Sequence, residues 1–421
     1  MYDYLKQHSP LPVHYESAIH CKRQAYDVGS EMYPSVKMVH NVGEKHRKQA
    51  RLNDRPYFMC EYAHAMGVGP GNTEAYWQEI YNYDNLMGGC VWEMVDHAVL
   101  HTDGSYTYGG DHGEWEHDRN FCVDGLFYPD RSPSTGAKLM RFIYRPIRVA
   151  HVSGRQFEVF NTTAFSTGRY RLAFRWNDGS KTILTPQTAP LTKETVTVPL
   201  GRAVDGLLAV IVETTDTVTG QIVSEEQLVL AQEVAAAPAV KPLPGDVAVE
   251  KGRLVCRKSG VVVAAGADEG TLLYRAPTDN DVDAMFHNLM VLYTRQTEET
   301  VSTQQTADGW QVVTKITNKR GRYMVTDTYK GTDSGVLVTS VLHRVSGSQE
   351  IPRFGKTFRL DEVFDAVHYI GRSGESYCDM KDQFPIRAVD CTVADMTEPN
   401  LRPQESGNRM DCTVASVSDG K

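Results

Sequence analysis

The chain has 421 residues, of which 41% are hydrophobic and 23% charged, a composition typical of a globular protein of about two to four domains. Its formal net charge of −9 at pH 7 argues against a nucleic-acid-binding protein, which needs a basic face. No apolar run approaches the ~20 residues of a membrane-spanning helix. We therefore expect a multidomain globular protein that binds neither nucleic acid nor a membrane.

The N-terminal third alternates between helical and strand patterns. Asn72 is suited to cap a helix, and apolar residues recur after it at helical spacing, at Tyr76, Ile80 and Tyr83. The expected helices span 1–7 and 72–86, and the expected strands span 13–16, 26–33, 57–61 and 89–96. Strands and helices joined by short connections are typical of a (β/α)8 barrel, and these elements amount to half of one.

The strand expected over 57–61 ends in a carboxylate. The apolar run Tyr57–Cys60 is typical of a strand buried on both faces, yet Glu61 follows it directly. An ionised carboxylate is costly to bury unless hydrogen bonds hold it, and catalytic groups gather at the carboxyl ends of barrel strands. Glu61 is therefore a candidate catalytic residue. A glutamate that only caps a loop is the alternative that the pattern leaves open.

The remainder of the chain has β patterns. Between residues 148 and 233, alternating runs such as Tyr170–Trp176 and Leu207–Val212 are separated by turn residues, which is typical of a β-sandwich. Residues 234–247 are rich in alanine and proline, which predicts a linker. Alternation resumes beyond them, for example in Val336–Thr339, and indicates a second, larger β domain over 248–421.

A series of motifs resembles consecutive landmarks of one enzyme family. The motifs are Arg55–Gly67, Gly88–Asp96, Tyr108–Asp111, Asp118–Leu126 and Tyr274–Asp281. In this order they resemble the large bacterial β-galactosidases of glycoside hydrolase family 2. The resemblance implies the C-terminal half of a TIM barrel over 1–147 and an immunoglobulin-like β-sandwich over 148–233. After the linker 234–247 it implies a truncated, galactose-mutarotase-like β-sandwich of the small-chain type over 248–421.

The resemblance also implies roles for individual residues. Glu61 matches the nucleophile of a retaining glycosidase that cleaves terminal β-D-galactose from lactose-like β-galactosides by double displacement. Tyr33 matches a tyrosine that hydrogen-bonds this nucleophile. His64 matches a histidine near the sugar hydroxyls, and Trp92 matches a tryptophan in the wall against which galactose packs. Without the resemblance, core packing is the default interpretation of Tyr33 and Trp92.

Metal ions are implied by the same resemblance. A sodium ion near the sugar's 6-hydroxyl would be held by the backbone carbonyl of Phe121 and by the side chain of Asp124. Asp124 stands where the family has an asparagine; it still offers a hard oxygen, but it adds a negative charge. Magnesium is implied for the intact enzyme, with ligands upstream of this chain, and no organic cofactor is expected.

Both ends of the expected site are incomplete. By family position the acid/base glutamate lies upstream of Met1, the family's last strands lie beyond Lys421, and Glu93 and Glu114 match no catalytic role. We therefore expect a fragment that is inactive or weakly active alone, from a parent enzyme that forms homo-oligomers. The alternative is a non-catalytic β-rich chain that binds carbohydrate or pairs with another subunit.

The cysteines and two polar clusters are not expected to form metal or redox sites. The cysteines show no Cys-x-x-Cys spacing, which argues against zinc and redox motifs. Cysteines such as Cys60 and Cys90 lie in expected barrel segments, where a cysteine usually serves as a small apolar residue, and this favours a reducing compartment. We therefore expect a cytoplasmic location, and a periplasmic or secreted one is the alternative left open. Asp279–Asp281 is expected to form a structural turn. Asp118 is expected to orient its loop rather than to bind a metal with His112 and His117.

Overall fold

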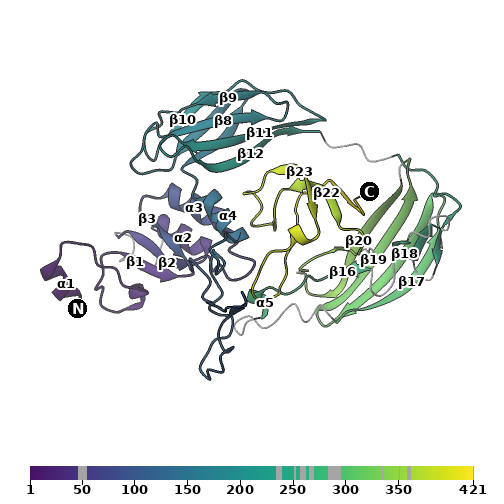
Figure 1. Cartoon of the computed structure of the whole chain (residues 1–421), viewed down its shortest axis with the longest axis horizontal. Coiled ribbons are helices and arrows are strands. Elements are labelled where there is room, and N and C mark those ends of the chain that lie inside the picture. Colours follow the sequence, from purple (N-terminus) through teal and green to yellow (C-terminus); the bar gives the residue numbers. More distant parts are fainter. Residues whose placement is uncertain are drawn as a thin grey trace. The chain divides into compact units, whose positions relative to one another are not determined.

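The computed structural model describes residues 1–45, 55–233, 239–250, 253–256, 262–264, 270–282, 295–333, 335–349, 351–357 and 362–420. The chain divides into two compact units (Figure 1). The first comprises Met1–Glu233 and Ala366–Val417, and the second comprises Val234–Asp365 and Ser418–Lys421. Among the residues described, no helix is long and apolar enough to cross a membrane.

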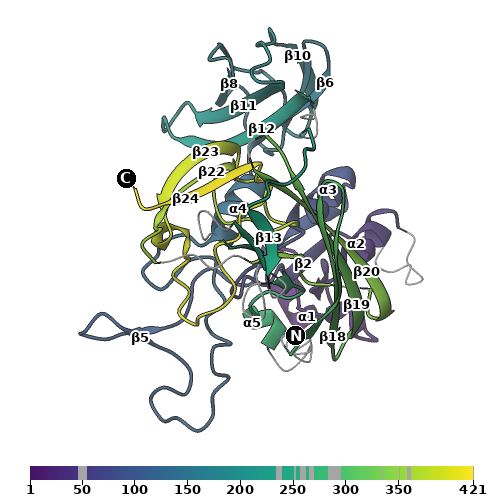
Figure 2. The ribbon, with the colours of Figure 1, turned by 90° about the vertical axis from the view of Figure 1, so that its right-hand side faces the viewer.

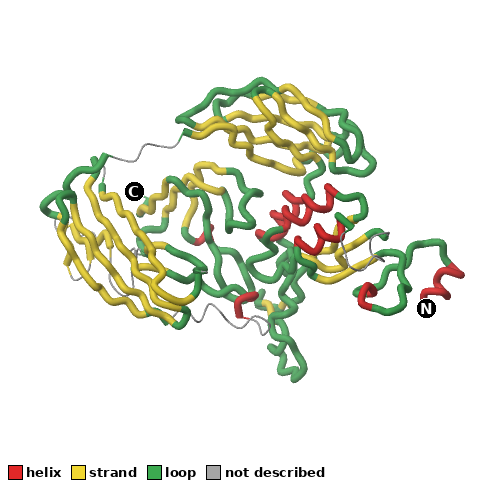
Figure 3. The backbone as a smooth tube through the Cα atoms, turned by 180° about the vertical axis from the view of Figure 1, so that it is seen from behind, coloured by secondary structure: helices red, strands yellow, loops and turns green. Residues whose placement is uncertain are grey.

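A parallel sheet lies in the N-terminal part of the first unit, with the strand order β1-β2-β3. Its strands are β1 (Gly29–Met32), β2 (Tyr57–Tyr62) and β3 (Leu86–Val91). The helices, red in Figure 3, are α1 (Tyr2–His8), the 3₁₀ helix η1 (Ala18–His20), α2 (Val36–Gly43), α3 (Thr73–Asn82) and α4 (Thr135–Ile143). Because α2 and α3 connect successive parallel strands, the sheet consists of strand–helix–strand units.

One face of the sheet is sealed by α2 and α3. Val42 of α2 and Ile80 of α3 share a buried cluster with Tyr57 and Met59 of β2. Tyr57 and Met59 are each 1% exposed, whereas Phe58, on the opposite face, is only half-buried. The expectation of a strand buried on both faces therefore holds for one face, the one on which the helices pack.

Two elements differ in extent from the expectation. The expected helix 72–86 ends at Asn82, since Tyr83 is extended (φ −133°, ψ 123°) and Leu86 begins β3. Asn72 takes the N-cap position, but with a φ of 58° and no side-chain cap hydrogen bond. The expected strand 13–16 is reduced to a single parallel bridge between His14 and Val28.

The expected strand 89–96 is also shorter, because β3 ends at Val91. Trp92 still donates its backbone N–H to the Tyr62 carbonyl of β2 (3.4 Å), and from Glu93 onward the chain pairs with residues 124–127. The Glu93 backbone N–H donates to the Asp124 carbonyl (3.1 Å), and the Asp96 N–H donates to the Phe127 carbonyl (2.9 Å). This pairing brings residue 124 to the end of β3. The loop that joins residue 96 to residue 124 contains a two-stranded hairpin of β4 (Val99–Leu100) and β5 (Tyr106–Thr107).

Residues 147–232 form two antiparallel sheets, ordered β10-β7-β6 and β12-β11-β8-β9. Their strands are β6 (Ile147–Ser153), β7 (Gln156–Asn161), β8 (Tyr170–Trp176), β9 (Lys181–Leu184), β10 (Lys193–Thr197), β11 (Leu207–Asp216) and β12 (Ile222–Gln232). Phe157 of β7 packs with Leu172 and Phe174 of β8 and Val212 of β11, all 0% exposed. Alternate side chains of these strands thus build a core between the sheets.

Residues 366–417 belong to the first unit although they follow most of the second along the chain. They contain β22 (Ala366–Arg372), β23 (Ile386–Thr392), the 3₁₀ helix η3 (Ala394–Met396) and β24 (Val414–Ser418), with the sheet order β23-β22-β24. Met380 packs in a buried cluster with Ile143 of α4. The Ile386 backbone N–H donates to Gln227 of β12 (2.9 Å), and Figure 2 shows β23 beside β12.

The second unit is dominated by an antiparallel sheet ordered β17-β18-β19-β20, accompanied by the sheets β13-β14-β15 and β16-β21. Its elements are β13 (Val247–Glu250), β14 (Arg253–Cys256), β15 (Val262–Ala264), β16 (Thr271–Leu272), α5 (Asp279–Val282), β17 (Thr297–Gln305), β18 (Gly309–Asn318), β19 (Gly321–Gly331), β20 (Val336–Gly347) and β21 (Gly355–Lys356). Leu273, Ile316, Tyr323 and Val325 are 0% exposed and form its core.

Two expectations fall in this unit. Asp279–Asp281 lies in α5, where the Asp281 carboxylate accepts the Thr278 backbone N–H (2.7 Å) and pairs with Arg275. These bonds give the segment a structural explanation. The expected linker 234–247 lies partly outside the described residues, and its last residue, Val247, begins β13.

Candidate active site

The predicted site residues gather at the carboxyl edge of the parallel sheet. Glu61 lies near the end of β2, Tyr33 directly follows β1, and Trp92 directly follows β3. The pairing register places Met32 beside Glu61. Because parallel strands run in the same direction, their carboxyl ends carry these side chains to one edge, the edge at which barrel enzymes place catalytic groups.

Tyr33 and Glu61 are joined through both backbone and side chain. The Tyr33 backbone N–H donates to the Glu61 carbonyl (2.8 Å), with Tyr33 in the left-handed region at a φ of 47°. Burial raises the pKa of the Tyr33 hydroxyl, and the hydrogen bond to Glu61 and the negative charge of that carboxylate raise it further. The hydroxyl is therefore protonated at neutral pH and can donate to the Glu61 carboxylate.

His64 contacts two aromatic side chains and a carboxylate. Its ring centroid lies 6.0 Å from that of Tyr33 and 5.4 Å from that of Phe121. Its Nε2 lies 3.4 Å from Asp124 Oδ2, a distance suited to an ion pair when the imidazole is protonated. The structure thus brings together predicted residues from the loop after β2 and from the loop before residue 124.

Asp124 is the most buried member of the group, with its side chain 2% exposed. Its Oδ2 accepts the indole N–H of Trp92 (3.1 Å). Burial alone would raise the pKa of Asp124, but hydrogen bonds with His64, Glu93 and Trp92 outweigh it and lower the pKa. Burial, together with the hydrogen bond and charge of Asp124, raises the pKa of Glu93. The opposite shifts make Asp124 the stronger acid of the pair.

A cation of the kind expected at Asp124 fits the groups present. Asp124 Oδ1 is buried and has no hydrogen-bond partner among the described residues. A buried, negatively charged oxygen without a donor suits a hard cation such as sodium, which prefers carboxylate and carbonyl oxygens. Phe121 ends a tight turn three residues before Asp124, since its backbone N–H donates to the Asp118 carbonyl (3.0 Å).

The histidines of the long loop between β3 and α4 have local partners. His112 Nε2 lies 2.8 Å from Thr107 Oγ1, and His117 Nδ1 accepts the Arg119 backbone N–H (3.2 Å). Within the described ranges, no group of three or more histidine, cysteine, aspartate or glutamate side chains could hold a metal ion. Asp118 contributes to its loop through its backbone carbonyl rather than through its carboxylate.

Sequence patterns alone do not reveal two further residues of the group. Glu93 matches no catalytic role by resemblance, yet it bonds with Asp124; its position immediately after Trp92 at a strand end is the one local signal. Asn120 is 5% exposed and accepts a hydrogen bond from Arg402 Nη1 (2.7 Å). Nothing in the sequence near Asn120 indicates a partner so far along the chain.

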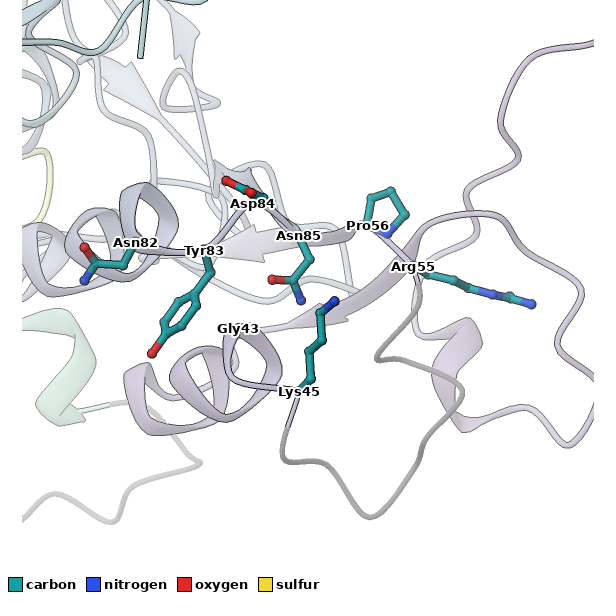
Figure 4. A pocket seen from close by; sticks show the side chains of 8 residues that line it. All are labelled: Gly43, Lys45, Arg55, Pro56, Asn82, Tyr83, Asp84 and Asn85. Carbon is teal, nitrogen blue, oxygen red and sulfur yellow. The ribbon is translucent and has the colours of Figure 1, made fainter. Parts of the chain in front are cut away.

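A separate pocket lies at the opposite edge of the sheet (Figure 4). It has a volume of about 640 Å³ and is lined by Gly43, Lys45, Arg55, Pro56, Asn82, Tyr83, Asp84 and Asn85. Pro56 and Asn85 precede β2 and β3, so this pocket is at the amino ends of the strands. It is therefore distinct from the group around Glu61.

Comparisons with known proteins converge on one family. Residues 1–149 match the family described as "Glycosyl hydrolases family 2, TIM barrel domain", and residues 250–421 match "Beta galactosidase small chain". A β-galactosidase of Staphylococcus xylosus is 27% identical over 463 aligned positions, covering 97% of this chain and 46% of that protein. One from Klebsiella pneumoniae is 40% identical over 144 positions, covering 32% of this chain and 14% of that protein.

The chain spans about half the length of curated relatives that match it along nearly its whole length. Among solved structures, a β-glucuronidase of Bacteroides uniformis is 12% identical, covering 80% of this chain and 44% of that chain, with a TM-score of 0.23.

Proposed function

The chain belongs to glycosyl hydrolase family 2, and from this we propose that it carries the nucleophile and part of the sugar site of a retaining β-galactosidase. The substrate class is terminal, non-reducing β-D-galactose in lactose-like β-galactosides. The observation that carries the proposal is the position of Glu61 at the carboxyl edge of the sheet, with the Tyr33 backbone N–H on its carbonyl (2.8 Å). The raised pKa of the Tyr33 hydroxyl, to which Glu61 contributes, supports it. Further support comes from relatives named β-galactosidase.

The reaction assigned to Glu61 is a double displacement. Its carboxylate attacks the anomeric carbon, the bond to the leaving oxygen breaks, and the bonding electrons depart with that oxygen. A water molecule then attacks the same carbon of the glycosyl-enzyme and releases the carboxylate. The Tyr33 O–H holds the charged carboxylate in one orientation before the attack and stabilises it again when it leaves. No residue of this chain is assigned the acid/base role.

The sugar is assigned to the space beside Trp92 and His64. Trp92 is 40% exposed, and its indole N–H is fixed on Asp124, so part of its ring surface remains accessible. An aromatic surface of this kind can pack against the C–H bonds of a pyranose ring. The His64 side chain is 19% exposed and can hydrogen-bond a sugar hydroxyl.

A sodium ion is proposed at the Phe121 carbonyl and the Asp124 carboxylate. When bound, it would offer a positive charge to a sugar hydroxyl oxygen. The partnerless Oδ1 of Asp124 supports this assignment. The extra charge of an aspartate, in place of the family's asparagine, favours tighter cation binding than a neutral amide would give.

Domain limits, assembly and location are part of the same proposal. The domain limits are those expected from the sequence: half-barrel 1–147, immunoglobulin-like sandwich 148–233, linker 234–247 and small-chain-type domain 248–421. The two packed sheets of residues 147–232 support the second of these. We also propose that the intact protein forms homo-oligomers and is located in the cytoplasm.

The proposed function is tested by trapping the glycosyl-enzyme. The chain is incubated with a 2-deoxy-2-fluoro-β-galactoside that carries a dinitrophenolate leaving group, which departs without protonation. Intact mass followed by peptide mapping should show one adduct, on Glu61. A chain that unfolds cooperatively but forms no adduct, or forms one on another residue, overturns the assignment and leaves a non-catalytic β-rich chain as the alternative.

A further inference from the structure

A segment near the C-terminus of the chain contacts both loops that carry the candidate active site. Residues 63–72, here called the nucleophile loop, follow β2 and include His64; residues 118–124, here called the Asp124 loop, include Phe121. The Arg402 guanidinium donates through Nη1 to the side-chain oxygen of Asn120 (2.7 Å). The two residues are separated by more than half of the chain, yet both belong to the first compact unit.

Asn120 is built into the turn that presents Asp124. Its backbone carbonyl accepts the Val123 N–H (3.0 Å), and the Cys122 carbonyl accepts the His97 N–H (2.8 Å). Asn120 is 5% exposed, so its side-chain amide needs partners within the protein. A charged donor on the amide oxygen is among the stronger hydrogen bonds available to it. Arg402 therefore fixes the turn at a residue four positions before Asp124.

The nucleophile loop is contacted by the same C-terminal segment. Gly67 has a φ of 61°, and a Cβ at this position would overlap the side-chain amide of Gln404. The Asn72 N–H donates to the Asp379 carbonyl (3.1 Å). Gln404 lies two residues from Arg402, so one short stretch of chain reaches both loops.

The segment does not need Arg402 in order to remain docked. Met380 shares an apolar cluster with α4, and buried Glu375 accepts the Thr135 hydroxyl at the start of that helix (3.1 Å). Tyr128 donates to Glu398 (3.4 Å). Because these contacts lie outside the Asp124 loop, the Arg402–Asn120 bond can be removed while they continue to hold the segment.

We propose that Arg402 is a positioning residue, which holds the Asp124 loop through Asn120 and thereby places Phe121 and Asp124 against His64 and Trp92. In this arrangement sugar binding depends on Arg402 of the C-terminal segment. The Glu61 carboxylate, which attacks the sugar, does not contact Arg402. The inference rests on the proposed function for its effect on the sugar, but the contact itself can be tested without any reaction.

The test compares three variants of the full chain. Arg402→Met removes the donor and keeps most of the side-chain volume. Arg402→Lys keeps the charge on a shorter group that lacks the guanidinium geometry. Arg409→Met is the matched control, because Arg409 lies in the same segment but donates to the Tyr369 hydroxyl (3.1 Å) instead. Hydrogen exchange of a peptide spanning 118–126 and labelling kinetics with the 2-fluorogalactoside are measured for each.

For Arg402→Met we expect about 10-fold faster exchange in the 118–126 peptide, because a hydrogen bond to a charged group is lost. The reagent's dissociation constant should rise about 10-fold, whereas the labelling rate at saturation should change by less than about twofold. Arg402→Lys should be intermediate, and it decides the question if Arg402→Met does not fold. Arg409→Met should match the unmodified chain in both measurements.

Unchanged exchange in both Arg402 variants, or an equal change in Arg409→Met, overturns the proposal. A lower labelling rate at saturation with an unchanged dissociation constant also overturns it, because that result places Arg402 in the chemical step. If the unmodified chain is not labelled at all, the proposed function fails. The exchange measurement still decides whether Arg402 holds the Asp124 loop.

Discussion

The sheet-on-sheet core of residues 147–232 and the carboxyl edge of the parallel sheet are stabilised in different ways. Between the two sheets, Phe157, Leu172, Phe174 and Val212 are 0% exposed and derive their stability from apolar burial. At the carboxyl edge, partly exposed aromatic residues surround a buried aspartate that is held by polar contacts. The first region depends on volume and area, and the second depends on the geometry of a few hydrogen bonds.

This difference predicts that substitutions in the first region will change the free energy of unfolding, and that substitutions in the second will change the labelling reaction. A cavity between the packed sheets should reduce the free energy of unfolding and leave the site intact in folded molecules. An isosteric change at the carboxyl edge should affect labelling more than stability, because little apolar area is lost.

The largest expected effect is that of Glu61→Gln. A neutral amide cannot attack the anomeric carbon, so the rate of adduct formation should fall on the order of 10⁴-fold. Intact mass over time measures this rate. Glu79→Gln is the matched control, since Glu79 of α3 pairs with His40 away from the site (3.0 Å), and its labelling rate should be unchanged. Equal labelling of both variants would place the nucleophile elsewhere.

Phe174→Ala should have the next largest effect, on stability alone. Removal of a fully buried aromatic side chain costs about 3–5 kcal/mol of unfolding free energy. Hydrogen exchange of β8 and β11 as a function of urea concentration reports it. Ile183→Ala, at a position 53% exposed in β9, should stay within about 1 kcal/mol. A change of labelling rate in folded Phe174→Ala would show that the two regions are coupled.

Asp124→Ala should reduce labelling about 100-fold, because Trp92 loses its hydrogen-bond acceptor and His64 loses its charge partner. Replacing potassium by sodium should accelerate labelling of the unmodified chain and not of this variant. Asp124→Asn keeps an acceptor oxygen and should remain within about fivefold of the unmodified chain. Equal sodium responses in all three proteins would remove Asp124 from the proposed cation site.

Tyr33→Phe should have the smallest effect, about a 10-fold loss of labelling rate, since it removes one hydrogen bond to the nucleophile. The comparison is with Tyr83→Phe, whose hydroxyl bonds Glu44 (3.2 Å) away from the candidate site. Labelling by Tyr83→Phe should equal that of the unmodified chain. An equal loss in both variants would indicate a general structural effect rather than a contact with Glu61.

Local patterns predicted the strands better than they predicted the site. The run Tyr170–Trp176 coincides with β8, because a period of two residues follows directly from strand geometry, and the run Leu207–Val212 covers the first six residues of β11. The end of β3 was predicted too late, since the backbone of Glu93 pairs with residue 124 rather than with β2. That pairing depends on tertiary structure and has no signature in the strand itself.

The residues of the candidate site were predicted from two different kinds of sequence information. The strand end at Glu61 was visible in the residues alone, whereas Tyr33, His64, Trp92, Phe121 and Asp124 were indicated by the resemblance, and the structure brings them together. Neither the residue pattern nor the resemblance indicated that Asn120 and Arg402 are in contact. Their hydrogen bond joins residues far apart along the chain, and only the folded first unit places them within 2.7 Å.

The most direct test of the central claim is competitive labelling of the folded chain by two 2-fluoro reagents that differ only in the configuration at C4. The account predicts a single adduct on Glu61, formed about 100-fold faster from the galacto reagent than from the gluco reagent, because a site that hydrogen-bonds one hydroxyl orientation rejects the other. An adduct on another residue, equal rates for both reagents, or no adduct on a folded chain would contradict it.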